Sequence, residues 1–410
     1  MIDGLINSVN LASVLGVSNS TVDTWVKSGK IKPRKKDKHY FYFFFNDLDF
    51  PDTKSMSNST WDSEHLIKPL REYKSIELFA GAGGLALGLE NAGFKHVALN
   101  EFDKDACETL RNNFKTAEIL EEDIHNIDFS KYKGIIDFIS GGFPCQAFSY
   151  AGNQKGFDDT RGTLFFELAR AIKEVQPKVF LGENVKGLLN HDNGKTFETI
   201  SKVIDELGYY LVPPRILKAV MYKVPQKRER IFLVGIRKDL ADRVTFHWPS
   251  PYKAVMTLRD AFYPGELYKT EVPKSEGQKY PKRKEEILSL VPQGGNWKNL
   301  PINLQKEFMK GSFNLGGGKT GIARRLSLDE PSLTLTCAPA QKQTERCHPL
   351  ETRPLTVREY ARIQTFPDEW TFAGNLTSQY KQIGNAVPVN LAEAMGHSLI
   401  HLLNDIEQLD

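Results

Sequence analysis

Four side chains from three segments of this 410-residue sequence are of the types that could act together on one substrate. Cys145 follows an apolar run and two glycines, and Glu183 lies within a second apolar run. Arg228 and Arg230 come just before a third. Because cationic neighbours favour the thiolate form of cysteine, this set of groups indicates nucleophilic catalysis by Cys145.

The apolar runs predict the strands that position these four groups. Residues 135–139 lead into the glycine turn before the cysteine, and residues 179–185 contain the glutamate. In an open α/β sheet, ligands collect at the carboxyl ends of the strands, so both side chains should face one bound molecule. The two arginines are two residues apart at the entrance of the strand 231–236 and therefore point to one face.

A glycine-rich turn follows another predicted strand, residues 76–79. The turn contains the dinucleotide-binding pattern G-x-G-x-x-A at Gly81, Gly83 and Ala86, and the helix after it should end at Gly93. This pattern alone is weak evidence for a cofactor, so the acidic residues that follow it matter.

Two acidic side chains follow the next predicted strands. Glu101 ends the strand 96–100, about twenty residues after the first glycine, where a carboxylate can bind ribose hydroxyls. Asp123 follows the next stretch and could accept a hydrogen bond from an adenine amino group. From these residues alone a nicotinamide cofactor stays open, and so does a plain βαβ unit with solvated acids.

The N-terminal segment has the helix-ending and helix-capping residues typical of a helix-turn-helix. Apolar residues within 11–15 form one short helical face, Gly16 ends it, and Ser18 or Ser20 caps a second helix. A basic turn and an aromatic run follow. The segment resembles the small winged helix-turn-helix domains of excisionase-like regulators, which implies DNA contact; the alternative is a solvated basic face.

Composition limits the class of protein. With 40% hydrophobic and 26% charged residues, the chain should form two or three globular domains. No long apolar run or secretory signal is present, so we expect a cytoplasmic protein without membrane contact. The net charge of +3 means that nucleic-acid affinity must come from local patches. The 4 cysteines lack disulfide or zinc spacing, so no metal is expected.

Six motifs, taken together and in order, resemble those of the cytosine-C5 DNA methyltransferases. One departure is Glu77, where that family usually has aspartate. The motifs are Glu-Leu-Phe-Ala-Gly-Ala-Gly-Gly (77–84), Gly-Phe-Pro-Cys-Gln (142–146), Glu-Asn-Val (183–185), Gln-Lys-Arg-Glu-Arg (226–230), Arg-Pro-Leu-Thr-Val-Arg-Glu (353–359) and Gln-Ile-Gly-Asn-Ala-Val-Pro (382–388).

The resemblance implies an α/β protein with a Rossmann-like domain that uses S-adenosyl-L-methionine, a smaller irregular target-recognition domain and the N-terminal winged helix-turn-helix. It also implies a set of cofactor-binding residues, which includes two far along the chain. The set is Phe79, Ala80, Gly81, Gly83, Glu101, Phe102, Asp123, Ile124, Pro144, Leu164, Asn385 and Val387.

The same resemblance implies a mechanism. The thiolate of Cys145 adds to C6 of cytosine, Glu183 holds ring N3, and Arg228 or Arg230 favours the thiolate and holds the base. Because a stacked base is out of reach, the cytosine must be flipped out of the duplex, and a polar loop within 146–163 should close over the DNA.

The implied domains are 1–60 (helix-turn-helix), 61–74 (linker), 75–238 (catalytic and cofactor binding), 239–350 (target recognition) and 351–410 (return to the catalytic domain). The target-recognition segment, 239–350, is rich in Pro, Gly, Lys and aromatic residues without long helical patterns. Several of its cations are expected to neutralise phosphates: Lys282, Arg283, Lys284, Lys319, Arg324 and Arg325.

We therefore predict a DNA (cytosine-5-)-methyltransferase that acts as a monomer on a short site in double-stranded DNA, as the modification enzyme of a restriction-modification system. Residues 1–60 are predicted to bind the gene's own promoter. Two alternatives are a tRNA cytosine-5 methyltransferase, because one branch of the family shares the motifs, and a transcription regulator with an inactive enzyme domain.

Overall fold

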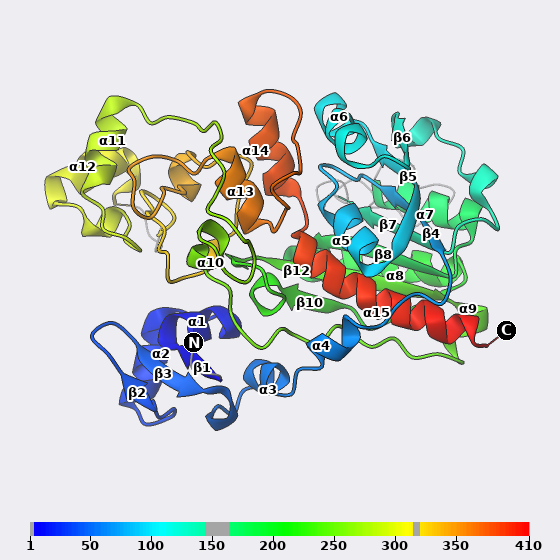
Figure 1. Ribbon diagram of the computed structural model, residues 1–410, viewed down its shortest axis with the longest axis horizontal. Helices are drawn as coiled ribbons and strands as arrows, with labels where there is room; N and C mark the ends of the chain where they lie inside the picture. The colour runs from blue at the N-terminus through cyan, green and yellow to red at the C-terminus, as the bar shows by residue number, and fades with distance from the viewer. Residues whose placement is uncertain (1–3, 144–163, 315–319, 410) are drawn as a thin grey trace. The chain divides into compact units, whose positions relative to one another are not determined.

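The computed structural model describes residues 4–143, 164–314 and 320–409, and the chain falls into two compact units (Figure 1). What we call the sheet unit comprises 59–218, 229–251 and 389–410. What we call the loop unit comprises 1–58, 219–228 and 252–388. Each unit is therefore assembled from segments that are distant in the sequence.

The sheet unit contains a mainly parallel sheet in the order β10-β12-β8-β7-β4-β5-β6, with β9 beside β12. Strands β4 to β8 run parallel to one another, whereas β12 is antiparallel to β8, β9 and β10. The strands are β4 (Tyr73–Leu78), β5 (Phe94–Glu101), β6 (Glu118–Glu121), β7 (Phe138–Gly142), β8 (Val179–Val185), β9 (Tyr209–Leu211), β10 (Arg215–Lys218) and β12 (Glu229–Arg237).

The strand order reverses at β4. From it the chain passes outward through β5 and β6 on one side and then returns to β7 and β8 on the other. In an open α/β sheet this reversal opens a crevice at the carboxyl ends of the central strands, where ligands bind. Ligand-binding residues are therefore expected after β4, β5, β7 and β8.

Helices pack on this sheet through apolar faces. Their bounds are α4 (Trp61–Glu64), α5 (Gly84–Ala92), α6 (Lys104–Asn113), α7 (Leu164–Val175), α8 (Lys195–Glu206), α9 (Lys238–Ala241) and α15 (Val389–Glu407). The core includes Ile139, Phe165 and Phe180, each at most 3% exposed. None of the helices in the described residues is long and apolar enough to cross a membrane.

The last helix, α15, lies along α5, the first helix after the glycine turn (Figure 1). Two glycines make the close approach possible. A Cβ at Gly88 would lie 2.4 Å from the Ala392 Cβ, and one at Gly396 would lie 2.5 Å from the Ala92 Cβ. A segment from the end of the chain therefore completes the layer that holds the glycine turn.

The N-terminal part of the loop unit has two helices and a small antiparallel sheet of order β1-β3-β2. Gly16, at φ 69°, ends the first helix, and the Ser18 side chain accepts a hydrogen bond from the Thr21 amide to cap the second. The elements are β1 (Leu5–Asn7), α1 (Ser8–Leu15), α2 (Asn19–Lys27), β2 (Lys35–Lys36), β3 (Phe41–Phe44) and α3 (Pro51–Ser57).

The remainder of the loop unit consists of short elements: β11 (Gln226–Lys227), α10 (Leu258–Phe262), α11 (Lys282–Ser289), α12 (Ile302–Met309), β13 (Ser332–Leu333), α13 (Val357–Ile363) and α14 (Leu376–Asn385). Buried arginines satisfy its irregular backbone. Arg325, 5% exposed, donates to the carbonyl oxygens of Leu288, Val291, His348 and Glu351.

Two sequence expectations differ from this architecture. Arg325 was expected to neutralise DNA phosphates, and that expectation is wrong, because its guanidinium is buried and bonded to backbone carbonyls. The expected linker 61–74 contains α4, in which Trp61 is only 7% exposed, and the first residues of β4. Polar composition around residue 60 did not reveal this buried tryptophan as an anchor.

Candidate active site

The turn after β4 has a backbone that few side chains adopt. Phe79 (φ 57°), Gly81 (φ 55°) and Gly83 (φ 82°) all lie in the left-handed region, and α5 begins at the next residue. Phe79 is the only one of the three with a side chain to strain this conformation. Such a turn brings backbone amides close to a ligand at the helix N-terminus.

Glu101, at the end of β5, is fixed by this turn and by its own loop. Its Oε2 accepts from the Gly81 amide at 2.8 Å, while its Oε1 accepts from the amides of Phe102 and Asp103, each at 2.8 Å. A carboxylate has about four acceptor positions, so further donors such as ribose hydroxyls can still bind. The remaining acceptor positions therefore fit the ribose hydroxyls of a cofactor.

Three more of the expected cofactor residues surround this edge of the sheet unit. The Phe102 side chain is 73% exposed, which leaves its ring available for a planar group. Asp123 caps a short helical turn whose first residue, Ile124, is buried, and it lies 2.6 Å from His125 Nδ1. Hydrogen bonds from His125 lower the pKa of Asp123, so this carboxylate is ionised at neutral pH.

The other expected cofactor residues have different locations. Leu164 is the first residue of α7 and packs partly buried against the core of the sheet unit. Asn385 and Val387 belong to the loop unit. There the Asn385 carbonyl accepts from Arg228 Nη2 at 3.3 Å, and its side chain accepts from the thiol of Cys337. Pro144 lies outside the described residues.

Glu183 and Arg230 form an ion pair at the carboxyl end of β8. The antiparallel register sets Arg230 opposite Val185 and Phe232 opposite Glu183, so the two charged side chains share one face. Arg230 Nε lies 2.6 Å from Glu183 Oε1, and the side chains are only 13% and 12% exposed. The structure thus pairs two of the four side chains that are expected to act on one substrate, and their catalytic roles stay predictions.

Strand β7 leaves room for this pair and is tied to β8. Gly142 pairs with Glu183, and a Cβ at position 142 would lie 3.1 Å from Glu183 Oε2. The Asn184 side chain donates to the Phe143 carbonyl at 2.8 Å. The chain that continues toward Cys145 thus starts beside the carboxyl group of Glu183; Cys145 itself and the loop 146–163 lie outside the described residues.

Glu77 is a buried acid near this site. In the sequence it is notable only because the family usually has aspartate at this position. It is 1% exposed and accepts a hydrogen bond at 3.2 Å from Ser140, its partner on β7. Burial raises the pKa of Glu77 to about 8, and the nearby charge of Glu183 acts in the same direction. Glu77 therefore carries its proton at neutral pH.

Arg228 differs from Arg230 although only one residue separates them. It precedes β12, belongs to the loop unit and is 1% exposed. Its guanidinium donates to the carbonyls of Leu335 and Asn385, at 3.4 Å and 3.3 Å. These contacts give Arg228 a scaffold function, and its expected catalytic contribution stays a prediction.

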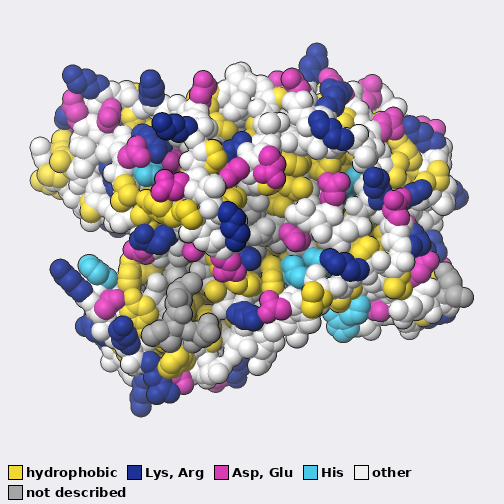
Figure 2. Space-filling view, in the orientation of Figure 1, with side chains coloured by type: hydrophobic (Ala, Val, Ile, Leu, Met, Phe, Trp, Pro, Cys, Tyr) yellow, Lys and Arg dark blue, Asp and Glu magenta, His cyan; other side chains and the backbone are white. Residues whose placement is uncertain are grey.

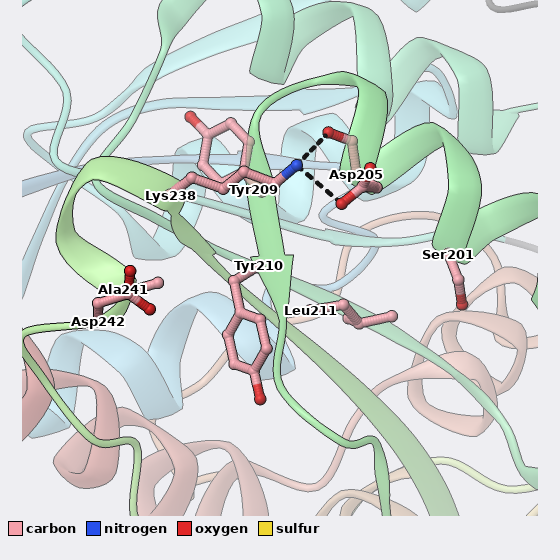
Figure 3. Close-up of a pocket in the computed structure, with 8 residues that line it drawn as sticks. All are labelled: Ser201, Asp205, Tyr209, Tyr210, Leu211, Lys238, Ala241 and Asp242. Carbon is pink, nitrogen blue, oxygen red and sulfur yellow. Dashed lines mark hydrogen bonds and ion pairs between the residues drawn. The ribbon is translucent and has the colours of Figure 1, made fainter.

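A hollow of about 460 Å³ lies elsewhere in the sheet unit (Figure 3). Lys238 and Asp205 form an ion pair of 2.7 Å beside it. Its strand β9 pairs with residues 235–237 at the far end of β12 from Arg230, so the hollow lies away from the carboxyl edge. The lining residues are Ser201, Asp205, Tyr209, Tyr210, Leu211, Lys238, Ala241 and Asp242.

The sheet, its glycine turn, the Glu101 carboxylate and the Glu183–Arg230 pair form an arrangement typical of α/β enzymes with a ligand site at the carboxyl edge. The model of the C-5 cytosine-specific DNA methylase family matches residues 73–401. The chain belongs to this family, and it is a DNA (cytosine-5-)-methyltransferase.

Individual relatives agree with this assignment. The chain is 59% identical over 400 residues to the Type II methyltransferase M.Eco47II of Escherichia coli, covering 97% of this chain and 96% of that protein. It is 50% identical over 345 residues to M.Sau96I of Staphylococcus aureus, covering 82% and 78%. Among solved structures, a candidate DNA modification methyltransferase from an E. coli prophage has a TM-score of 0.64 at 25% identity, covering 81% of this chain and all of that one (100%).

Proposed function

We propose that this enzyme is the modification methyltransferase of a restriction-modification system and methylates C5 of a flipped cytosine through a covalent adduct with Cys145. The observation that carries the proposal is the Glu183–Arg230 pair, nearly buried at the carboxyl edge where β7 leads toward Cys145. A buried carboxyl group beside a guanidinium is suited to holding one edge of a pyrimidine ring. The motifs of the family supply the nucleophile.

The chain's own residues perform the proton and bond steps. The Cys145 thiolate forms a bond to C6, and Glu183 holds a proton at N3 as negative charge develops on the ring. Arg230 keeps Glu183 oriented by its 2.6 Å contact. When C5 carries the new methyl group, a base removes the C5 proton, the ring electrons re-form the C5–C6 double bond, and the thiolate leaves.

S-adenosyl-L-methionine, when bound, supplies an electrophilic methyl group. We propose that Glu101 holds its ribose hydroxyls, that the 79–83 turn approaches its amino-acid part, and that Phe102, Asp123 and Ile124 flank its adenine. Glu101 is held by three backbone amides, so the carboxylate needs no rearrangement to accept these hydroxyls. Pro144, Leu164, Asn385 and Val387 complete the proposed set.

Reaching C5 requires the base to leave the duplex, since its ring is otherwise stacked. We assign closure over the DNA to the loop 146–163 and sequence reading to residues 239–350. Of the phosphate-binding cations expected in that range, Arg283 remains exposed and contacts Glu307 and Glu286. Lys284 instead forms an ion pair with the buried Glu345.

The decisive experiment follows labelled methyl transfer from S-adenosyl-L-methionine to mixed-sequence duplex DNA, with tRNA as a parallel substrate. We expect transfer to duplex DNA only, and none by the Cys145→Ala variant. DNA containing 5-fluorocytosine should trap a covalent complex with the wild-type chain. Transfer to tRNA alone, or normal transfer by Cys145→Ala, would contradict the proposal.

For the N-terminal segment we propose a winged helix-turn-helix that binds the gene's own promoter. The proposal rests on α1 and α2 joined at Gly16 and on the exposed lysines of β2, Lys35 and Lys36. Figure 2 displays Lys and Arg side chains gathered over the β2 and β3 region. Such a basic hairpin can contact phosphates beside a helix that lies in the major groove.

A gel-shift titration of the full chain on its own upstream fragment tests this second role. Lys36→Glu should weaken promoter binding several-fold more than Lys202→Glu, a matched change on the exposed face of α8. Equal affinity for the promoter and for random DNA would refute autoregulation while leaving the methyltransferase proposal intact.

A further inference from the structure

Away from the candidate active site, three metal-ligating side chains of the sheet unit meet where the segment after α4 passes α15. They are His65, Glu393 and His397, and each offers a ligand atom within 4.8 Å of the others. Within the described residues, this is the one such group of three. Figure 2 shows histidine side chains gathered on the surface over α15.

His65 is oriented as a metal-binding imidazole usually is. Its Nδ1 lies 2.8 Å from the carbonyl oxygen of Trp61, and its ring stacks on the Trp61 ring with 4.0 Å between centroids. A proton on Nδ1 donates to that carbonyl, which leaves the lone pair on Nε2. Nε2 is buried and has no hydrogen-bond partner in the protein.

His397 presents a second nitrogen in the same condition. Its side chain is 4% exposed, its Nδ1 is buried without a hydrogen-bond partner, and its ring centroid lies 4.3 Å from that of His65. A ring nitrogen without a proton binds a metal ion through its lone pair.

Glu393 supplies the anionic ligand. It lies one turn before His397 on α15, and its Oε1 is 4.0 Å from His397 Nε2. Asn91, next to the last residue of α5, donates to the other carboxylate oxygen at 3.3 Å. Leaving the buried Nε2 of His65 unpaired is unfavourable, and a cation bound by His65, His397 and this carboxylate would satisfy it.

We propose that His65, Glu393 and His397 bind one divalent transition-metal ion, with zinc as the best match to two imidazoles and a carboxylate. This donor set is one that zinc takes with water in its fourth position. The ion would tie the segment after α4 to α15, the helix that packs on α5 behind the glycine turn. It stands apart from the methyl-transfer chemistry, and its function is to fasten these elements together.

The test uses the full-length chain without an affinity tag, stripped of metal with a chelator. Zinc affinity is measured by competition with a chromophoric chelator, and coordination is measured from the visible absorption of the Co²⁺ form. We expect one high-affinity ion per chain, a tetrahedral Co²⁺ spectrum without thiolate charge-transfer bands, and a raised melting temperature with zinc.

Glu393→Gln, at a partly exposed position that should tolerate the change, is expected to weaken zinc binding at least 10-fold and to remove the zinc-dependent rise in melting temperature. His397→Gln should have a larger effect. The control is Asp405→Asn, because Asp405 pairs with His401 at the same i,i+4 spacing on α15 without a third ligand among the described residues. The control variant should bind zinc like the wild type.

Three results would overturn the proposal. The first is no saturable zinc binding by the wild-type chain. The second is binding that Glu393→Gln leaves unchanged, and the third is a Co²⁺ spectrum with thiolate bands, which would place the ion on a cysteine. None of these readouts depends on methyl transfer.

Discussion

Arg230 in the sheet unit and Arg325 in the loop unit are both largely enclosed by protein, but their partners differ. Arg230 pairs with a carboxylate, Glu183, at the edge where the parallel strands end. Arg325 is bonded to the carbonyl oxygens of four residues of irregular chain. One charge lies at the edge where ligands of an open α/β sheet collect, whereas the other replaces the hydrogen bonds that a helix or strand would make.

The same contrast extends across the loop unit. Arg362 is fully buried and donates to the carbonyls of Ala261, Thr270 and Glu271 as well as to Asp368. Where secondary structure is sparse, a guanidinium with five donors can satisfy several carbonyls at once. Removing a charge of the Glu183–Arg230 pair should therefore affect catalysis, whereas removing a buried arginine of the loop unit should affect folding.

The largest expected effect is on catalysis. Glu183→Gln keeps the shape of the side chain but removes the carboxyl proton at N3, so the methyl-transfer rate constant should fall about 10²- to 10⁴-fold. Single-turnover transfer to duplex DNA measures it, with a melting curve to show that the variant is folded. A methyl-transfer rate constant within threefold of wild type would contradict the proposed catalytic role of Glu183 in the sheet unit.

Next comes Arg325→Met, which leaves several buried carbonyls unpaired. The free energy of unfolding should fall by about 3 kcal/mol or more in urea titrations. Arg283→Ala, an exposed position of the same unit, should leave the unfolding midpoint unchanged. Should both variants unfold at the wild-type midpoint, the loop unit would not depend on its buried arginines.

Helix packing in the sheet unit should give a smaller loss. Gly88→Ala places a Cβ against Ala392 and the Val389 carbonyl, and we expect a cost of about 1–3 kcal/mol in the free energy of unfolding. Gly187→Ala is the control, since among the described residues no heavy atom beyond its chain neighbours lies within 4 Å of its Cβ position. Equal stability of the two variants would mean that α5 and α15 separate easily.

The last expected effect is a pH dependence, which is small within any one pH unit. The folded pKa of Glu77, about 8, lies above its ordinary value of 4.5, so its stabilising contribution is complete below pH 4.5 and is lost as the pH rises toward 8. Replacing Glu77 by Gln should make the unfolding free energy fall less steeply with pH over this range. The change in slope should correspond to less than one proton, which is below about 1.4 kcal/mol per pH unit. An unchanged slope would show that Glu77 is ionised when folded.

Much of the sheet unit could be predicted because its signals are local. The strand 179–185 and the helix end at Gly93 each depend on residues within a few positions. Glu183 and Arg230 could also be brought together, because their strand ends lie at one edge. What the sequence lacked was the register that sets Gly142 against Glu183.

The loop unit could not be predicted in the same way. The carbonyl partners of Arg325 lie 23 to 37 residues away in irregular chain, so no periodic pattern marks them. Arg325 therefore looked like a surface cation in a basic stretch. In the sheet unit, the pairing of Ser140 with Glu77 could not be predicted either, since the two are 63 residues apart and meet only through the strand order.

The packing of α15 on α5 has a consequence for synthesis. Residues 84–92 leave the ribosome about three hundred residues before 389–407, which corresponds to some tens of seconds at about 5–20 residues per second. During that interval α5 lacks its covering helix, and its apolar face is open to chaperones or to other nascent chains. The parts of the chain that are made first must therefore wait for one of the last before they reach their final structure.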